Sequence, residues 1–193
     1  PRTPPPAAPP PPARRAGAPP PTCPSTPGRA RPPSRRTCGS SVLGDKSAHL
    51  RPGGLKQGEK QYAVSAIVLV SYDKKKNIFF AQQNFPKEQN RMAIPIDHGH
   101  PGHVVRTKEA LLLSNTDDYE DFRQILKTSK MGSSIYAPLI WQGEILGQLI
   151  CGAQARNTYR EIDLEYLKIY ADLAVILWNA YDGPAILKQL IEE

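Results

Sequence analysis

The residues with the most obvious chemical potential lie in the heptapeptide 97–103, which reads Asp-His-Gly-His-Pro-Gly-His. Three imidazoles and a carboxylate this close together could hold a transition metal or orient a polar ligand. A structural zinc site has four ligands, however, and Asp97 is the one candidate for the fourth. In an extended segment the His-x-His spacing would also point alternate side chains apart. Two interpretations therefore stay open, a metal or polar-ligand site and a loop of partly solvated histidines, and the spacing favours the second.

Residues suited to other catalytic chemistry are few. Cys151 lies inside an apolar run, as a small buried hydrophobe would, and a resolving partner would have to come from Cys38. Asp117 and Asp118 are adjacent, so on a helix they point in different directions and fit the first turn better than an acid–base pair. The glycines form neither a P-loop nor a dinucleotide fingerprint. We therefore expect no enzyme activity and no resident metal in this chain.

The composition divides the chain into two parts. Residues 1–60 hold 11 Lys and Arg against 2 Asp and Glu, together with 16 of the 21 prolines, whereas residues 61–193 hold 14 against 16. The first part cannot bury enough apolar surface to fold, which predicts a disordered, Pro/Arg-rich basic tail over 1–60. The second part predicts one compact domain over 61–182 and a C-terminal extension, or the start of a linker to an absent output module, over 183–193.

The tail has two interpretations: an arm that meets nucleic acid or a polyproline-binding module, and a solvated leader. No aromatic side chain is interleaved with its arginines to stack on bases, which argues against nucleic acid. The chain has no run of 18 apolar residues and no apolar core near its start. We therefore expect no membrane partner and a cytoplasmic location.

Alternating apolar residues predict two β-hairpins. One combines runs 64–72 and 78–85, and the other joins 134–141 to 144–154 through a turn at Gly143. Between the hairpins the sequence predicts a short helix with Pro101 in its first turn and a buried strand at 111–114. A further helix, capped by Thr116, would end near Lys130.

A long helix is predicted to begin near Tyr159, where Thr158 and Glu161 have the spacing of a capping box. Its apolar residues form two seams. The first seam is Leu164, Leu167, Ala171, Ala174, Trp178 and Tyr181. The second seam is Ile162, Tyr166, Ile169, Leu173, Ile176 and Ala180. One seam can cover the sheet while the other covers a second helix, from this chain or another copy; the alternative is a fully buried core helix in a monomer.

These motifs, in this order, resemble a GAF domain over roughly residues 62–182. The resemblance is carried by the Gly-x-x-Gly-x-Val turn at 99–104, a Leu-rich strand ending in Asn-Thr-Asp at 115–117, a Pro-Leu strand at 138–139, the Gly-Glu-Ile-Leu-Gly hairpin at 143–147, and the Arg-x-x-Tyr-x-x-x-Asp motif at 156–163. It implies an α+β fold, an antiparallel sheet of about six strands with helices on both faces. It also implies a regulatory, small-molecule-binding sensor of a signal-transduction protein that passes ligand state through its C-terminal helix.

The resemblance also implies site residues. The ligand pocket would be lined by His98, His100, His103, Asn115, Thr116 and Tyr136. A homodimer would form through the C-terminal helix, with the first seam as the dimer contact. The family's first helix is missing or replaced, because the segment 51–58 is a poor helix former.

The ligand itself is unknown, but two types fit poorly. Cyclic-nucleotide-binding members carry Asn-Lys followed by Phe-x-x-x-Asp-Glu; here Asn157 precedes Thr158, and Asp163 precedes Leu164. Bilin-binding members need a pocket cysteine, and none accompanies the histidines, so no covalent bilin is expected. Two further alternatives remain: an enzyme resembling free-methionine sulfoxide reductase or depending on a metal, and a structural dimerisation module.

Overall fold

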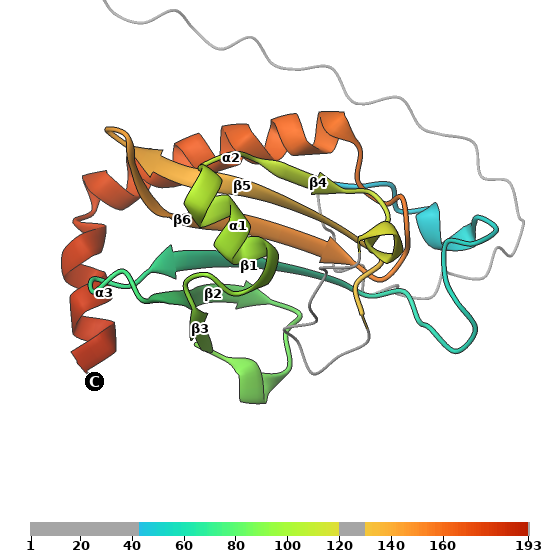
Figure 1. The fold of residues 1–193 in the computed structure, drawn as a ribbon, viewed down its shortest axis with the longest axis horizontal. Helices are drawn as coiled ribbons and strands as arrows, with labels where there is room; N and C mark the ends of the chain where they lie inside the picture. Colours follow the sequence, from blue (N-terminus) through green and yellow to red (C-terminus); the bar gives the residue numbers. More distant parts are fainter. Residues whose placement is uncertain (1–42, 120–129, 193) are drawn as a thin grey trace, which may run out of the picture. The chain divides into compact units, whose positions relative to one another are not determined.

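The fold is an open six-stranded antiparallel sheet with helices on both faces (Figure 1), as the sequence predicts. The computed structural model describes residues 43–119 and 130–192. Its main elements are β1 (Ala63–Val70), β2 (Lys76–Gln83), β3 (Ala93–Pro95), α1 (Gly99–Thr107), β4 (Leu111–Leu113), β5 (Ser133–Trp141), β6 (Glu144–Ala153), α2 (Glu161–Ala180) and α3 (Gly183–Glu192). None of the helices in the described ranges is long and apolar enough to cross a membrane.

The two predicted hairpins form and become neighbours in the sheet. The strand order is β3-β2-β1-β6-β5-β4, so the first strand pairs with the last. In the second hairpin the two-residue loop of Gln142 and Gly143 has positive φ at both positions, 49° and 83°. That geometry is a type I′ turn, whose twist matches the strands that it joins.

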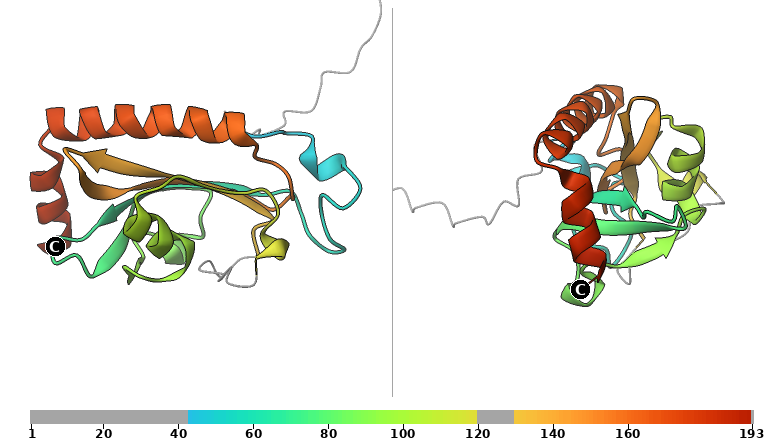
Figure 2. Two further views of the ribbon diagram at one scale, coloured as in Figure 1. Left: turned by 45° about the horizontal axis from the view of Figure 1, so that its top comes forward. Right: turned by 90° about the vertical axis from the view of Figure 1, so that its left-hand side faces the viewer.

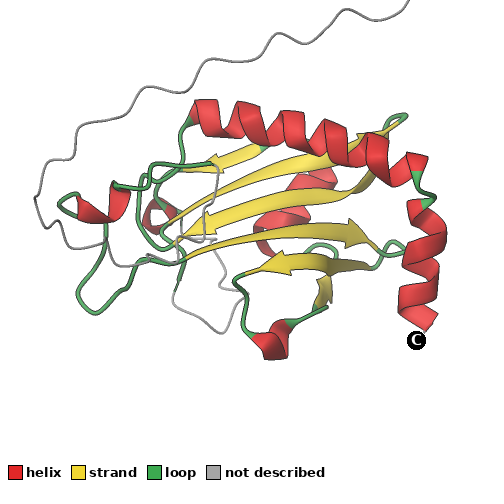
Figure 3. Ribbon diagram, turned by 180° about the vertical axis from the view of Figure 1, so that it is seen from behind, coloured by secondary structure: helices red, strands yellow, loops and turns green. Residues whose placement is uncertain are grey.

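Alternate residues of the central strands line two separate cores. On one face Leu69, Ile135 and Cys151 pack against α2, and on the other Val68 and Tyr136 lie on the side of α1. The end-on view in Figure 2 shows α1 and α2 on opposite sides of the sheet. From behind, α2 runs lengthwise over the strands (Figure 3).

Helix α2 begins at Glu161, and its cap differs from the predicted one. The Asp163 carboxylate accepts a hydrogen bond from the Arg160 amide at 3.0 Å. The Thr158 hydroxyl instead donates to the Ala155 carbonyl at 2.7 Å. The predicted Thr158–Glu161 capping box is therefore wrong, because the helix begins two residues later than that spacing suggested, with Arg160 as its N-cap and Asp163 in the place of Glu161.

The first apolar seam of α2 packs against the chain's own sheet. Leu164, Leu167 and Ala171 are buried there, and Trp178 meets Phe80 of β2 edge to face at 5.4 Å. These residues are not available to a second copy, so their assignment to a dimer contact is wrong. Of the first seam, Tyr181 is exposed, and Ala174 is partly buried against the same core.

The segment 43–60 folds onto the domain, so the predicted tail boundary at residue 60 is wrong. Leu43 and Ala48 are buried, and the Gly44 amide donates to the Asp163 carboxylate at 2.8 Å. The Arg156 amide donates to the Gly54 carbonyl at 2.9 Å. Polar and glycine-rich composition suggested disorder, but long-range hydrogen bonds hold this arm.

Between β4 and β5 the Thr116 region forms a short 3₁₀ helix, Thr116–Asp118, capped by Asn115. The predicted cap at Thr116 is wrong, because Asn115 caps this turn and the backbone is extended again at Tyr119. Residues 120–129 of the helix predicted to run to Lys130 lie outside the described residues. After α2 the chain turns at Asp182, with φ of 51°, and continues as α3. The break predicted at residues 182–184 is confirmed.

Gly147 permits the close approach of β6 to β1, which we test by substitution. A Cβ there would lie 2.1 Å from the Val68 carbonyl oxygen, so Gly147→Ala should lower the free energy of unfolding by roughly 2 kcal/mol or more. Gly152→Ala on the same strand is the matched control, because its Cβ would meet the movable Met131 side chain at 3.3 Å. Urea unfolding followed by circular dichroism compares the two; equal losses would contradict the account.

Candidate functional site

The candidate site is the sheet face beneath α1. Val104 of α1 is fully buried against Leu113 and Tyr136. Gly102 makes this packing possible, because a Cβ there would lie within 2.3 Å of the Asp97 backbone. The predicted Gly-x-x-Gly-x-Val motif therefore acts through backbone packing, and it places His100 against the sheet.

Two of the predicted ligand residues meet at this face. The rings of His100 and Tyr136 stack with centroids 6.2 Å apart and planes inclined by 25°. Tyr119 meets the His100 ring edge to face at 6.3 Å. An imidazole between two phenol rings offers a ligand both flat apolar surface and polar edges.

Two buried polar atoms on the same face lack a hydrogen-bond partner within the described part of the chain. They are the Gln148 carbonyl oxygen on β6 and the Ser134 hydroxyl on β5. Gln148 is fully buried, and its amide nitrogen donates to the Pro101 carbonyl at 3.0 Å, which holds the side chain beneath α1. Leaving a buried acceptor unpaired costs about 1–3 kcal/mol, so each of these atoms suits a ligand or a bound water.

Burial raises the pKa of Tyr136 to about 12, and the neighbouring Ser134 side chain acts in the opposite direction. Tyr136 is therefore a neutral phenol at physiological pH, and its hydroxyl can donate a hydrogen bond to an acceptor. Together with Gln148 and Ser134 it gives this face both donors and acceptors without a formal charge.

The other predicted ligand residues have structural surroundings. His98 forms the N-cap of α1. The backbone carbonyl of the exposed His103 accepts a hydrogen bond from the Thr107 hydroxyl. The Asn115 side chain caps the 3₁₀ helix, and the buried Thr116 hydroxyl donates to the Met131 carbonyl. Within residues 43–119 and 130–192, no three His, Cys, Asp or Glu side chains are placed to hold a metal ion.

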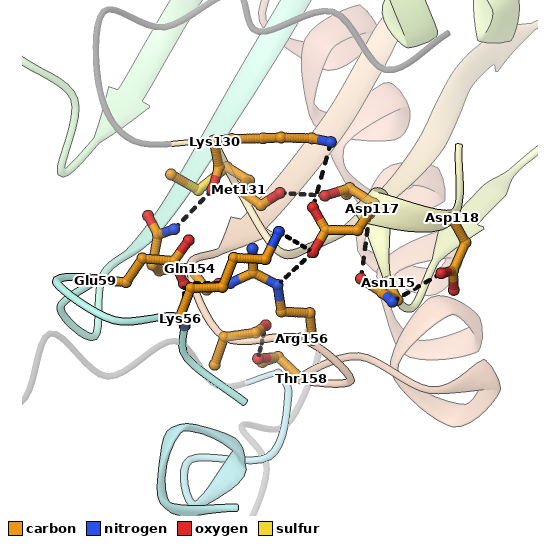
Figure 4. A network of polar contacts seen from close by, with 12 residues as sticks. Lys56, Glu59, Asn115, Asp117, Asp118, Lys130, Met131, Gln154, Arg156 and Thr158 are labelled. Atoms are coloured by element: carbon orange, nitrogen blue, oxygen red, sulfur yellow. Dashed lines mark hydrogen bonds and ion pairs between the residues drawn. The ribbon is translucent and has the colours of Figure 1, made fainter. Parts of the chain in front are cut away.

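A network of charges lies beside this site and fastens the N-terminal arm (Figure 4). The Arg156 guanidinium, whose side chain is 5% exposed, pairs with the carboxylates of Glu59 and Asp117. Lys56 reaches Asp117 at 2.8 Å, and Lys130 reaches it at 3.4 Å. The arm, the end of β6 and the chain after β4 are thereby held together.

The network lowers the pKa of both carboxyl groups. For Asp117 the hydrogen bonds from Lys56 and Arg156 outweigh burial and hold the pKa well below its ordinary value. For Glu59 burial opposes ionisation, but Arg156 and the Lys56 amide outweigh it and lower the pKa. Both groups are therefore ionised at neutral pH.

The described cavities lie away from His100 and Tyr136. A cavity of about 800 Å³ is lined by residues of β2, β3 and α3. A second cavity of about 270 Å³ lies between α2 and the sheet. Cys151 lines the second cavity, where burial raises the pKa of its thiol to about 12. A thiol with that pKa is a poor nucleophile at neutral pH.

Sequence reasoning missed Ser134, Gln148 and the Arg156 network. Ser134 lies two residues before Tyr136 on the same strand, so the period of two could have placed both on one face. Gln148 is a polar residue inside an apolar strand, which is a usable signal. The pairing of Arg156 with Glu59, 97 residues apart, leaves no local pattern.

The chain belongs to the GAF domain family, whose model matches residues 56–179. The match begins inside the arm that carries Lys56 and Glu59 and ends one residue before α2 does. No curated protein sequence matches the chain.

Solved structures with this fold include GAF domains and enzymes. The GAF domain from Acinetobacter phosphoenolpyruvate-protein phosphotransferase is 16% identical, with a TM-score of 0.56 over 62% of this chain and 73% of that one. A free methionine-R-sulfoxide reductase from Neisseria meningitidis, solved with its substrate, is 19% identical, with a TM-score of 0.56 over 63% and 70%. At these identities the likeness shows the fold alone.

The charge network should make stability depend on pH. Because the carboxyl pKa values are lowered on folding, the network stabilises the fold above the ordinary carboxyl pKa of about 4 and loses this effect as the pH falls below it. Asp117→Asn should cost about 1–2 kcal/mol at pH 7, and the gap to the natural chain should narrow towards pH 3. Asp118→Asn, which removes an exposed carboxylate bonded to Asn115, is the control. Thermal unfolding between pH 3 and 7 measures both; a gap independent of pH would contradict the assignment.

The thiol of Cys151 should be inert in the folded protein. In a Cys23→Ser, Cys38→Ser background, an aromatic disulfide reagent at pH 8 should react with it at least about 100-fold more slowly than in urea-unfolded chain, because burial disfavours the thiolate. Fast labelling of the folded chain would instead show an accessible thiolate and revive the reductase alternative.

Proposed function

We propose that this chain is a regulatory sensor module that binds a small, uncharged polar molecule on the sheet face beneath α1. The observation that carries the proposal is the pair of buried, unpaired polar atoms of Ser134 and Gln148 beside the stacked His100 and Tyr136 rings. Their chemistry favours a ligand with a planar part and at least one donor group. A cytoplasmic location and a role in signal transduction belong to the same proposal.

A route from the ligand to α2 runs through neighbouring residues of β5. Ser134 points to the ligand face, whereas the next residue back, Ser133, points to the opposite face. The Ser133 hydroxyl accepts a hydrogen bond from the Tyr159 amide at 3.3 Å, just before α2 begins. A ligand that shifts β5 would therefore move the start of α2 through this bond.

The sensor interpretation is favoured over a reductase by the thiol chemistry. Cys151 is the one cysteine among the described residues, and it lies on the α2 face of the sheet, away from the site under α1. A reductase needs a reactive thiolate at its substrate. This domain offers none at the candidate site.

Native mass spectrometry of the full chain, purified under gentle conditions, tests the proposal. We expect a retained small molecule, and we expect Ser134→Ala to lower its retention about 5- to 10-fold, the loss of one hydrogen bond. Ser134→Ala removes one side-chain interaction within the protein, the one with Tyr136, so circular dichroism has to show that the variant keeps its fold.

His103→Ala is the control, because His103 is an exposed histidine on α1, the helix that also carries His100. It should retain the ligand as the natural chain does. If nothing is retained, and a panel of polar metabolites fails to raise the melting temperature, the sensor proposal is wrong.

A further inference from the structure

The cavity of about 800 Å³ between α3 and the outer strands β2 and β3 has no part in the function proposed above. It is lined by Ile78 and Phe80 of β2, Ala93 of β3 and Leu187 of α3. Ile78 pairs with Leu69 on one side and with Ala93 on the other, and paired residues point to the same face of a sheet. Leu69, Phe80 and Leu187 belong to the core beside α2. The cavity therefore lies mainly on the side of the sheet opposite to α1.

The wall of the cavity that α3 contributes is fixed at two points. Leu187 is 7% exposed and packs into the core beside α2. The Tyr72 hydroxyl donates a hydrogen bond to the Pro184 carbonyl at 2.8 Å, which ties the first turn of α3 to the turn between β1 and β2. Figure 3 shows α3 running from the end of α2 past the ends of the strands. The cavity is therefore part of the folded domain, and its volume is within the range of small-molecule sites, about 300–1,000 Å³.

The charged side chains that line this cavity are mainly basic. Lys76 begins β2, Arg91 precedes β3, and Lys188 belongs to α3. Asp73 is the one acid among the described lining residues, and its carboxylate accepts a hydrogen bond from the Ser71 hydroxyl at 2.6 Å. Neither Lys76 nor Arg91 forms a salt bridge within the described part of the chain. An apolar cavity with this excess of positive charge favours a ligand that carries a negative charge.

The two basic residues of the outer strands lie at opposite ends of the apolar floor. Ile78 pairs with Ala93, and continuing that register places Arg91 level with Phe80. Lys76 lies two residues to the other side of Ile78, so about 13 Å of strand separates the two positions at 3.3 Å per residue. An acidic group held by either cation leaves room for an apolar body over Ile78 and Ala93.

We propose that this cavity binds a small amphipathic anion, a molecule with an apolar body of about ten carbons and one acidic group. The apolar body displaces water from Ile78, Ala93 and Leu187, which supplies most of the affinity. Lys76 and Arg91 select for the acidic group, because a charge-assisted hydrogen bond is stronger than a neutral one. A ligand in this position contacts both the sheet and α3, so it also stabilises the attachment of α3.

Charge argues against the chain's own N-terminal tail as the occupant. Residues 1–42 hold seven arginines and no acidic residue. Bringing these arginines to Lys76 and Arg91 would place like charges together, which is unfavourable. The inference does not depend on the ligand proposed beneath α1, because the two sites lie on opposite faces of the sheet.

Fluorescence titration of the full chain with two dyes tests the charge preference. The first dye, 8-anilino-1-naphthalenesulfonate, carries one sulfonate, and the second, N-phenyl-1-naphthylamine, has the same rings without it. We expect the double variant Lys76→Gln, Arg91→Gln to weaken the sulfonate dye about 10-fold and the uncharged dye less than about 2-fold, since each exposed cation contributes up to about 5-fold. The double variant Lys75→Gln, Lys87→Gln is the matched control, because it removes the same charge from two exposed lysines outside the lining. Equal effects of the two double variants would overturn the proposal.

Substitution at Ala93 tests the position of the dye. Ala93 is exposed on the cavity floor, so Ala93→Trp fills the space for the apolar body and should weaken both dyes at least about 10-fold. Ala93→Ser keeps the space open and should bind both dyes as the natural chain does. Circular dichroism checks that each variant folds. Undiminished binding by Ala93→Trp would place the dye elsewhere and overturn the proposal.

Competition identifies the occupant. Decanoate, added below its micelle concentration, should displace the sulfonate dye and slow hydrogen exchange of the α3 amides. Displacement by a synthetic peptide of residues 1–42, and not by decanoate, would assign the cavity to the tail and overturn the proposal. Ser134→Ala, which alters the site beneath α1, should leave dye binding unchanged, so this inference and the proposed function can fail separately.

Discussion

The pairing of β1 with β6 is the constraint on which the rest of the domain depends. It joins Ala63 to Ala153 and Leu69 to Gly147, residues that lie far apart in the sequence. Each strand is also half of a local hairpin, so this one ladder turns two hairpins into a single sheet. Its register decides which side chains face α1 and which face α2, because a slip of one residue would exchange the two faces. The site and the helix contact both follow from it.

Local elements were predictable, whereas their long-range partners were not. The alternation in β5 and β6 and the turn at Gly143 identified a hairpin with nearly correct bounds. The sequence of a hairpin does not show which strand it pairs with in the sheet. The expectation of a single antiparallel sheet came from the family resemblance. The same limit applies to the arm at residues 43–60, whose composition suggested disorder. Its ordered structure depends on Arg156, which lies about 100 residues away in the sequence and so leaves no local signal.

Helix α2 shows why periodicity alone could not choose between faces. Both seams repeat at steps of three and four, and both are apolar enough to form a core. What separates them is side-chain size near the sheet: Ala171 and Ala174 allow close approach, whereas Tyr166 and Ile169 on the other seam would hold the helix away. The candidate site illustrates the opposite case. His100 and Tyr136 could be chosen by their positions in the family motifs. Ser134 and Gln148 became candidates only because the structure buries a polar atom of each without a hydrogen-bond partner, and a sequence does not show this.

The corner between α2 and α3 has a mechanical consequence. A Cβ on Gly183 would lie 2.0 Å from the Trp178 indole, so the ring and the glycine backbone fix the angle of the corner. The same indole rests on Phe80 of β2. Any tilt of β2 therefore acts on the pivot of α3, a helix about 15 Å long, and a rotation of about 10° would displace its far end by roughly 3 Å. The Trp178 indole therefore couples the direction of α3 to the position of β2.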